Sequence, residues 1–426
     1  MTTLPSSFDG RRQNLPASGI SYYTRQIPIN VTTCNAGGSV IFELPGNLPS
    51  TYLNTNASFL RVKLNTSNPD NSANELAKLG PAGFAGTIRN IHVSQQGHVL
   101  SEIQDYGKYR AIQQGLNCDY SYIDGLGRAL NGTSSYQDGE ASTNGFDDRV
   151  FIEPLAHHGG LFGCGRMIPL KGASIHYKVE FGDANYGIEF TTETGYSNSN
   201  VEFSEIELVL CMVQLSDSAE AMLSKQGGWS VLTKGVGTYV NSVRDGVSMH
   251  TINLGASYSQ LLNVNWVFTD PSANPTLAHQ NTDFDDNNLR KWSFSIDGVT
   301  VDNQKGILAD CPAEIAAFNA IANGKLTSLT ACPVLQSGSA IANSKGLSTV
   351  FTQSLEIYKG ACGNFGDQWE NMKLACSGRS TLSSTTNVHL EFGNSGADGD
   401  RIFTLFATYA QQISYDPVSN LFRVAN

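Results

Sequence analysis

Charged residues are scarce in this chain, at 15% of its 426 positions, and the basic ones never form a run. The formal net charge is −11, and the first thirty residues hold only three cations, Arg11, Arg12 and Arg25. Neutralising phosphates requires many cations in a small volume, so direct nucleic-acid binding by a basic arm is disfavoured. An acidic surface that associates with itself is the better interpretation.

Long apolar runs are also missing. No run approaches the roughly 20 residues that cross a bilayer, and even the segment 206–213 contains Glu207. The first seven residues show no basic segment followed by an apolar one, so we expect no secretory signal and no transmembrane segment. The protein should therefore be made and kept in a reducing cell interior.

The eight cysteines include no Cys-x-x-Cys pair, which disfavours a zinc knuckle. In a reducing compartment, disulfides are disfavoured, and the sequons at Asn30, Asn56, Asn65 and Asn131 should carry no glycan. The cysteines are Cys34, Cys118, Cys164, Cys211, Cys311, Cys332, Cys362 and Cys376.

No catalytic signature is present, whether a Gly-x-Ser-x-Gly elbow, a His-Glu-x-x-His helix, a Walker loop or a dinucleotide fingerprint. Gly125-Leu126-Gly127 lacks the third glycine of that fingerprint and predicts a turn. His157, His158 and Cys164 lie on a Gly-rich segment without a fourth ligand, so loop contacts are the preferred interpretation over a metal site.

The densest acidic segment is 283–288, with Asp283, Asp285 and Asp286. Its carboxylates suit calcium, but the segment lacks the glycine and the distant glutamate of a calcium-binding hand, so a solvated loop is favoured. We assign no catalytic, cofactor or metal residue, and we do not expect an enzyme.

Distant stretches of the chain repeat one alternating pattern. Two of them place apolar residues at every second position and end in Phe-Gly, at Phe181 and Phe392. Three matches in the same order, at nearly one spacing, predict two tandem copies of one β-rich unit. The matches pair residues 176–183 with 387–394, 91–100 with 294–301, and 206–213 with 402–409. The second match is followed in both copies by a helix-like segment, at 106–116 and at 313–322.

The expected fold is all-β, with two tandem jelly-roll domains, each an eight-stranded β-sandwich, and short helices in the long loops. An immunoglobulin-like sandwich is the alternative, but the recurring helical insertion favours the jelly roll. The expected boundaries are an N-terminal arm at 1–17, a first jelly roll at 18–216, a linker helix at 217–228, a second jelly roll at 229–414 and a C-terminal tail at 415–426.

Several local expectations accompany this division. Asp217 is expected to cap the linker helix, and the polar stretch 118–151 is expected to be a projecting loop without a core. Leu60, Val62 and Leu64 should face the core of the first unit. Strands of that unit are expected at 20–24, 39–44, 59–64, 88–93, 98–103, 176–181 and 206–215.

Five strings carry a family resemblance: Phe42-Glu43-Leu44-Pro45, then 58–64, then 91–97 leading into 106–111, then Arg166-Met167-Ile168-Pro169-Leu170, and Trp292 to Gly298 in the second unit. In their order along nearly the whole chain, these features resemble the double jelly-roll major capsid proteins of tailless icosahedral DNA viruses, particularly the virophage, polinton-like and adintovirus branch. None of the strings is unique to that family.

The resemblance implies a structural protein of the virion capsid. It implies a homotrimer of pseudo-hexagonal outline, in which each chain brings two similar barrels around a threefold axis. It further implies minor capsid and vertex proteins as partners.

Two other functions remain open at this point. A tandem jelly-roll carbohydrate-binding or attachment protein would use aromatics such as Trp229, Trp266, Trp292 and Trp369, although core packing explains most aromatics of a sandwich. A cupin-like metalloenzyme would require converging histidines, and the spacing of the chain's histidines forms no such set. The histidines concerned are His92, His98, His176, His250 and His389.

Overall fold

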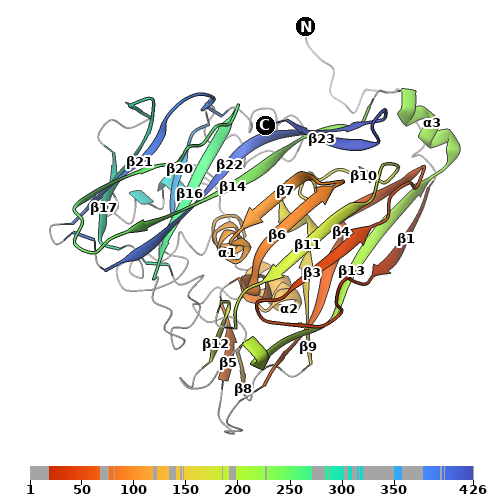
Figure 1. Cartoon of the computed structure of the whole chain (residues 1–426), viewed down its shortest axis with the longest axis horizontal. Coiled ribbons are helices and arrows are strands. Elements are labelled where there is room, and N and C mark those ends of the chain that lie inside the picture. The colour runs from red at the N-terminus through yellow and green to blue at the C-terminus, as the bar shows by residue number, and fades with distance from the viewer. Residues whose placement is uncertain are drawn as a thin grey trace, which may run out of the picture.

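Alternating apolar residues form the strands of two β-sandwich barrels that lie side by side (Figure 1). In the computed structural model, the described residues are 19–67, 76–80, 82–118, 122–133, 141–143, 146, 148–184, 186–190, 198–225, 228–270, 284–285, 287–301, 306–308, 314–315, 317–319, 350–356, 378–393, 396–397 and 399–425.

The first barrel packs two sheets face to face. One sheet has the order β1 (Gly19–Gln26), β13 (Val201–Leu215), β4 (Thr51–Thr66) and β10 (Ile168–Pro169), with β2 (Cys34–Asn35) on β13 and β9 (Arg149–Pro154) on β4. The facing sheet has the order β3 (Ser39–Leu44), β11 (Ile175–Phe181), β6 (Ile88–Gln95) and β7 (His98–Gln104). Every segment expected to be a strand of the first unit lies within one of these strands.

The second barrel repeats this arrangement. One sheet has the order β14 (Ser230–Val243), β22 (Arg401–Asp416), β16 (Leu261–Thr269) and β20 (Phe351–Ser354), with β23 (Leu421–Ala425) on β22. The facing sheet has the order β15 (Met249–Asn253), β21 (Thr386–Phe392), β17 (Leu289–Ile296) and β18 (Val299–Thr300), with β19 (Ile307–Leu308) on β17.

The two barrels have the same strand order, which confirms the internal duplication and the double jelly-roll fold. The three sequence matches fall on equivalent strands, namely β11 and β21, the hairpins β6–β7 and β17–β18, and β13 and β22. Both hairpins turn through two residues with positive φ, Gln96-Gly97 at 47° and 83° and Asp297-Gly298 at 51° and 77°. Two consecutive residues with positive φ form a tight two-residue hairpin turn, and such a turn favours glycine at its second position.

The third match is out of register by one residue. Leu208 and Leu210 pack in the first barrel, whereas in the second the core residues are Phe403 and Leu405. When residues 206–213 are aligned with 402–409, Phe403 and Leu405 fall opposite positions of β13 whose side chains point away from the core. β13 contains two irregularities in its pairing with β4, and each extra residue reverses the faces that follow it.

Each core is built around stacked aromatic rings. In the first barrel, Phe181 stacks on Phe203 with the ring centroids 4.0 Å apart, and Leu60, Val62 and Leu64 are fully buried as expected. In the second barrel, Trp266 meets Trp292 edge-on at 5.5 Å. Aromatic rings bury more apolar surface per residue than aliphatic side chains, so these contacts contribute strongly to each core.

Helices occupy the long connections. They are α1 (Tyr106–Asn117), α2 (Arg128–Asn131) and α3 (Asp217–Lys225), with the short turns η2 (Gly83–Thr87), η3 (Tyr122–Gly127), η4 (Leu155–His158) and η5 (Asn198–Asn200). Of the helix-like segment 313–322, the described residues 314–315 and 317–319 are helical. Within the described part of the chain, none of the helices has the length and apolar character that a bilayer crossing requires.

The cap of α3 is Ser216 rather than Asp217. The Ser216 hydroxyl accepts a hydrogen bond from the Ala219 amide at 3.4 Å, and its carbonyl accepts one from the Glu220 amide at 3.0 Å. Asp217 is therefore the first helical residue, and its negative charge there interacts favourably with the helix dipole.

The stretch 118–151 is only in part a loop. It contains η3, α2 and β8 (Ala141–Thr143), and β8 joins β5 (Leu76–Leu79) and β12 (Ile188–Phe190) in a small separate sheet. Phe146 is buried against Phe151, with the ring centroids 5.9 Å apart, so the expectation of a stretch without core contacts was wrong. Figure 1 shows that the small sheet projects from one end of the first barrel.

The expected C-terminal tail is largely a strand. β22 continues to Asp416, and β23 pairs with it from Leu421 to Ala425. Phe422 is buried because its ring packs against Trp229 at 5.4 Å and Tyr415 at 5.5 Å. Most of the segment 415–426 therefore belongs to a sheet of the second barrel and is not a tail.

Candidate functional site

The junction between the barrels is the most elaborate polar region of the described structure, and α1 lies at its centre. Lys108 extends from α1 into the second barrel, where its Nζ donates to the Thr404 hydroxyl at 3.2 Å. The ring of Tyr109 packs against Phe406 at 5.6 Å. Burial lowers the pKa of Lys108, while Asp105 at 3.7 Å opposes that change. The helix therefore inserts an ammonium and an aromatic ring into the neighbouring sheet.

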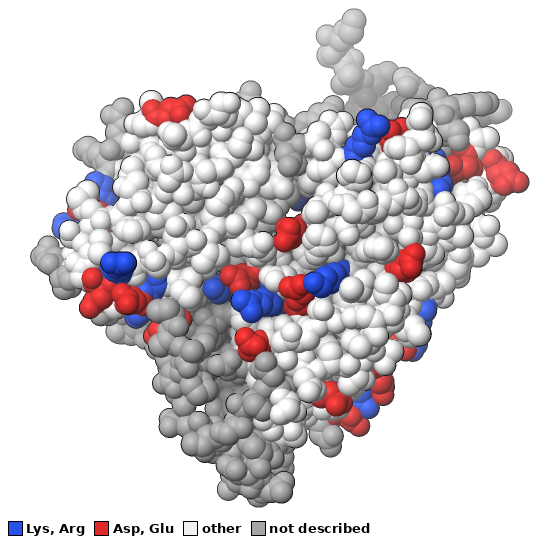
Figure 2. Space-filling view, viewed as in Figure 1, with Lys and Arg blue, Asp and Glu red and all other residues white. Residues whose placement is uncertain are grey.

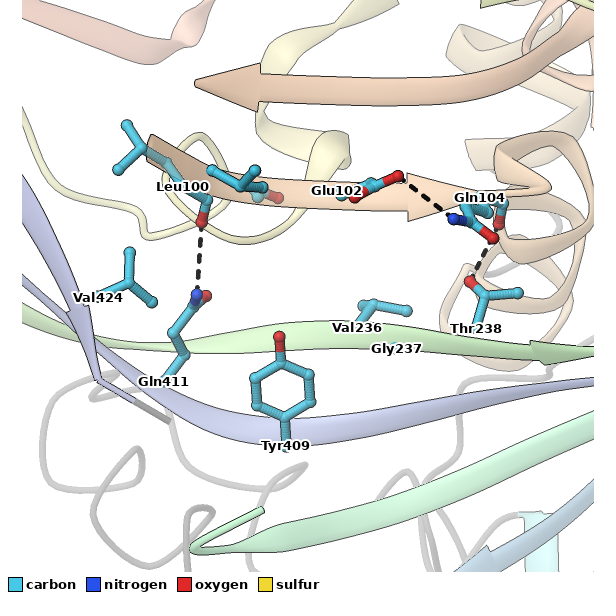
Figure 3. Close-up of a pocket in the computed structure, with 11 residues that line it drawn as sticks. Leu100, Glu102, Gln104, Val236, Gly237, Thr238, Tyr409, Gln411 and Val424 are labelled. Atoms are coloured by element: carbon cyan, nitrogen blue, oxygen red, sulfur yellow. Dashed lines mark hydrogen bonds between the residues drawn. The ribbon is translucent and has the colours of Figure 1, made fainter. Parts of the chain in front are cut away.

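The edge of β7 lies along β14 and β22 (Figure 3). Thr238 Oγ1 donates to the Gln104 carbonyl at 3.1 Å, and Gln411 Nε2 donates to the Leu100 carbonyl at 3.4 Å. Between these two contacts lies a groove of about 340 Å³, to which Tyr409 presents its ring. Glu102 is the one charged residue among those that line the groove, so no set of charged groups converges there and the groove is a feature of the junction.

Backbone hydrogen bonds reinforce the junction. The Gly160 amide donates to the Lys234 carbonyl at 3.1 Å, and the Gly160 carbonyl accepts from Thr233 Oγ1 at 3.1 Å. Gly160 has a φ of +52°, and a Cβ there would lie 2.5 Å from Ser101 Oγ, so this close approach requires glycine. The second barrel is thus held at a fixed position on the first.

Apolar packing also crosses the junction. Val231, Val236, Val267 and Phe406 of the second barrel belong to the same contiguous core as the first barrel. An interface that resembles a domain core is characteristic of a permanent contact. The two barrels therefore share one buried core at the junction.

A buried carboxylate beneath α1 holds this helix in place. Glu153, on β9, is fully buried and accepts hydrogen bonds from Tyr106 Oη at 2.7 Å, from Arg110 Nε at 3.3 Å and from Asn131 Nδ2. Burial by itself would raise the pKa of Glu153, but Arg110 and His157 outweigh burial and hold it at about 2. The carboxylate ties α1, α2 and β9 together.

The residues His157, His158 and Cys164 have different surroundings in the structure. His157 joins the Glu153 network, at 3.3 Å from the carboxylate. His158 is buried between Tyr106 and Tyr177, with ring centroids at 5.3 and 5.4 Å, and burial lowers its pKa to about 3. Cys164 Sγ contacts the Arg166 carbonyl at 3.6 Å. The preferred interpretation as loop contacts fits these placements.

The acidic segment 283–288 is described only in part. Asp283 and Asp286 lie outside the described residues, and Asp285 forms a salt bridge with Arg401. Among the described residues, no group of three or more His, Cys, Asp or Glu could hold a metal ion.

The tryptophans do not gather on the surface. Trp266 and Trp292 are buried in the second core, and Trp229 donates its Nε1 to the Met167 carbonyl at 2.8 Å. Trp369 lies outside the described residues. The five histidines considered for a cupin site are half-buried or exposed on the strands β6, β7, β11, β15 and β21, so none enters a barrel core.

The outer face of the β1–β13–β4 sheet is a feature that sequence reasoning missed. It carries a continuous chain of ion pairs: Arg25 with Glu207 at 3.1 Å, Glu207 with Arg61 at 3.5 Å, Arg61 with Glu205 at 3.1 Å, and Lys63 with both Glu205 at 3.1 Å and Asp148 at 2.9 Å. Tyr23 lies on the same side of β1 as Arg25 of this ion-pair ladder and is exposed, whereas Ile20 and Tyr22 lie on the other side of the strand. The segment after β1 exposes further large apolar side chains, namely Ile27, Ile29 and Val31.

A signal for this surface existed in the sequence. Residues 20–31, which comprise most of β1 and the segment after it, hold six large apolar residues and a single charge, an unusual composition for a sheet edge that meets water. On the face drawn in Figure 2, many charged side chains lie in a band across the middle, others lie near the edges, and large uncharged areas remain between them.

No protein-family model matches the chain, and no curated protein matches it by sequence. Solved structures do match it over both barrels. The PBCV-1 protein VP54, fitted into a reconstruction of the virophage Sputnik, aligns with a TM-score of 0.65 at 9% identity and covers 97% of this chain and 98% of its own.

Two virophage structures match over the full chain. The Sputnik virophage structure aligns with a TM-score of 0.57 at 12% identity, covering 100% of this chain and 92% of its own. The mavirus major capsid protein aligns with a TM-score of 0.53 at 12% identity, covering 100% and 95%. At identities this low, the structural match shows a shared fold alone, and that fold is the double jelly roll expected from the sequence.

Proposed function

We propose that this protein is the major capsid protein of a tailless icosahedral DNA virus. In this proposal it associates into homotrimers of pseudo-hexagonal outline, which tile the shell. The observation that carries the proposal is the match of the whole chain, both barrels included, to capsid proteins such as that of mavirus. A match to one barrel alone would carry much less, because single jelly rolls serve many functions.

The physical design of the chain supports a structural role. A continuous core and backbone hydrogen bonds fix the second barrel on the first, so each chain is a rigid tile with two similar halves. Three such chains supply six similar barrels, and closed rings of identical chains form when each contact repeats the same rotation. Minor capsid and vertex proteins would then be partners of the assembled shell.

The carbohydrate-binding alternative gains no specific support. Two of the four tryptophans are buried in the core, and a third is held by the Met167 carbonyl at the junction. The described surface therefore offers no tryptophan platform for a sugar ring.

The proposal is tested by measuring the mass of the purified protein by size-exclusion chromatography with light scattering, and by imaging the same sample by electron microscopy. We expect particles of three times the chain mass of 45.8 kDa with a six-sided outline, or closed shells. A stable monomer at micromolar concentration that binds a glycan array would contradict the proposal and favour the attachment protein.

A further inference from the structure

Two cavities at the junction between the barrels join into one groove along β7. The cavity of about 340 Å³ described above and a second cavity of about 490 Å³ share Val99, Leu100 and Val424 among their lining residues. We call the two together the junction groove. It follows β7 from His98 to Gln104, with β14 and β22 on its other side and β23 at its wider end. Its size lies in the range of sites that bind ligands in proteins.

The edge of β7 presents backbone groups to this groove. The carbonyls of Leu100 and Gln104 point towards the second barrel, because they accept hydrogen bonds from Gln411 and Thr238. Backbone groups alternate between the two sides of a strand, so the N–H and C=O of Glu102 point the same way as those of Gln104. Among the described residues, no backbone partner meets Glu102 on this side. An edge strand with free backbone groups can accept another strand beside it.

Gln411 supplies a buried acceptor that the described part of the chain leaves unused. The residue is 4% exposed, and its Nε2 donates to the Leu100 carbonyl at 3.4 Å, but its Oε1 has no hydrogen-bond partner there. Figure 3 shows this side chain pointing from β22 towards β7. Buried polar atoms in native proteins are usually hydrogen-bonded. A backbone N–H of a strand lying along β7 would supply the missing hydrogen bond.

The charges of the junction groove indicate which kind of segment fits it. Arg423, at the wider end, is paired with Asp416. Glu102 has no Lys or Arg partner in the part of the chain that the structure describes, and its carboxylate lies 4.0 Å from the His92 ring nitrogen. Val99, 50% exposed, adds an apolar surface. A complementary segment is therefore extended, carries a cation opposite Glu102 and places an apolar side chain at the wider end.

One segment of this chain has that composition. The ten residues between Pro5 and Pro16 contain no proline, and they hold Arg11 and Arg12, two of the three cations among the first thirty residues. Proline has no backbone N–H, so a strand that pairs through its backbone requires a stretch of this kind. Residues 6–15 lie outside the described residues.

The spacing of this segment matches the spacing along β7. In an antiparallel pair, a strand that places Leu15 opposite His98 also places Arg11 opposite Glu102, because four positions separate the two members on each strand. The apolar Leu15 then lies at the wider end of the junction groove, and the guanidinium of Arg11 meets the carboxylate that lacks a Lys or Arg partner.

The start of β1 lies at the same end of the molecule as the wider end of the groove. Gly19, the first residue of β1, pairs with the last residue of β13, directly before α3. Glu220 of α3 lies 3.8 Å from Lys171, and the Ala173 amide donates to the carbonyl of Asn420, in the turn before β23, at 3.1 Å. Figure 1 shows α3 and β23 along one edge of the molecule. Residues 16–18 join the segment to this edge.

We propose that residues 6–15 lie in the junction groove of the same chain, as an extended strand antiparallel to β7. Arg11 pairs with Glu102, and a backbone N–H of the segment donates to Gln411 Oε1. The segment thereby covers the seam between the barrels and adds contacts to both of them. This inference does not depend on the proposed function, because it concerns contacts within one chain.

The first test places the photoreactive residue p-benzoylphenylalanine at position 99 of the full chain, in place of Val99. After irradiation, peptide mapping by mass spectrometry identifies the residues that it has bound. We expect crosslinks to residues 6–15, in a product that keeps the single-chain mass of 45.8 kDa. The same group in place of Val299, 70% exposed on the equivalent hairpin of the second barrel, is a matched control and should not reach that segment.

The second test measures the rate at which trypsin cleaves the folded full chain after Arg11 and Arg12. A segment held in a groove is cut only while it is released, so this rate follows the population of the released form. Glu102→Lys places a cation against Arg11, and we expect cleavage about 10-fold faster than in the unaltered protein. Glu391 of the second barrel has a similar side-chain exposure, 41% against 46% for Glu102, so Glu391→Lys is the control and should leave the rate unchanged.

Either test can overturn the proposal. If no crosslink joins position 99 to residues 6–15, another segment fills the groove or none does. A product of twice the chain mass would assign the groove to the segment of another copy. Equal trypsin rates in the unaltered protein, Glu102→Lys and the control would show that the segment is not held at Glu102. None of these results bears on the proposed function, and circular dichroism confirms that faster cleavage does not come from unfolding.

Discussion

Replacing Glu153 with glutamine should destabilise the whole chain, because this carboxylate is the only anion that the described structure places against the buried Arg110 guanidinium. Glu153→Gln keeps the size and shape of the side chain and removes only its charge. Arg110 then stays buried without its counter-charge, and removing one partner of a buried ion pair costs about 3–5 kcal/mol.

The shift in unfolding temperature follows from that cost. A unit of about 200 residues loses roughly 2–4 °C in its midpoint for each kcal/mol, so Glu153→Gln should lower the midpoint by about 10 °C. Differential scanning calorimetry measures this directly. A second substitution, Arg110→Met, should recover part of the loss, because the double variant no longer buries an isolated charge.

A matched control lies on the ion-pair ladder. The Glu205 side chain is 52% exposed and contacts Arg61 and Lys63, and solvent screens these ion pairs, so Glu205→Gln should lower the midpoint far less than Glu153→Gln does. If Glu153→Gln shifts the midpoint no further than Glu205→Gln does, the buried network does not hold α1 in place and the reasoning is refuted.

Three more predictions concern substitutions in the two cores, a substitution in a hairpin turn, and the dependence of stability on pH. Phe181→Asp and Phe392→Asp should each bury an unpaired charge and prevent trimer formation in light scattering; normal trimers from both would disprove the assigned inward faces. Gly298→Val should lower the free energy of unfolding, measured by chemical denaturation, by about 1–2 kcal/mol. The backbone of Gly298 has a φ of +77°, which strains any residue with a Cβ although no atom would clash with it. An unchanged denaturation midpoint would contradict this reasoning. The pKa of His158 is lowered from 6.5 to about 3, so stability should fall as pH drops from 6.5 to 3, and less so in His158→Phe; identical pH profiles would exclude His158 as the cause.

The fold could be predicted from the sequence because the duplication leaves the same signal twice. The Phe-Gly ends of β11 and β21 and the glycine turns of the two hairpins mark equivalent strands. A jelly roll fixes where each such strand lies, so three matches in order were enough to indicate two tandem sandwiches.

The details that failed depend on contacts between distant residues. The irregular pairing of β13 shifts its register, and no local pattern announces such an irregularity. β23 becomes a strand only because β22 extends far enough to pair with it, and Phe146 is buried only because Phe151 lies beside it. Tertiary context decided each of these.

The polar networks were the least predictable part, because the buried Glu153 network and the exposed ion-pair ladder both assemble from separate strands and helices. Arg25, Arg61 and Glu207 are far apart in the sequence and become neighbours only across β1, β4 and β13. The sequence shows that the segment 20–31 is unusually apolar. It does not show that the charged residues beside β1 form ion pairs with one another.

The two sheet faces show how duplicated barrels acquire different contacts without changing their fold. On the second barrel the outward residues of β22 and β16 include Thr404, Phe406 and Val267, which are buried against the first barrel. On the first barrel the equivalent face carries the ion-pair ladder and the exposed Tyr23. An apolar face suits a junction that never opens, whereas a polar face with paired charges suits a contact that forms after the chain has folded. The same strand order therefore supports two different sheet faces: in the second barrel the outward residues are buried by the first barrel, and in the first barrel they carry paired charges and the exposed Tyr23.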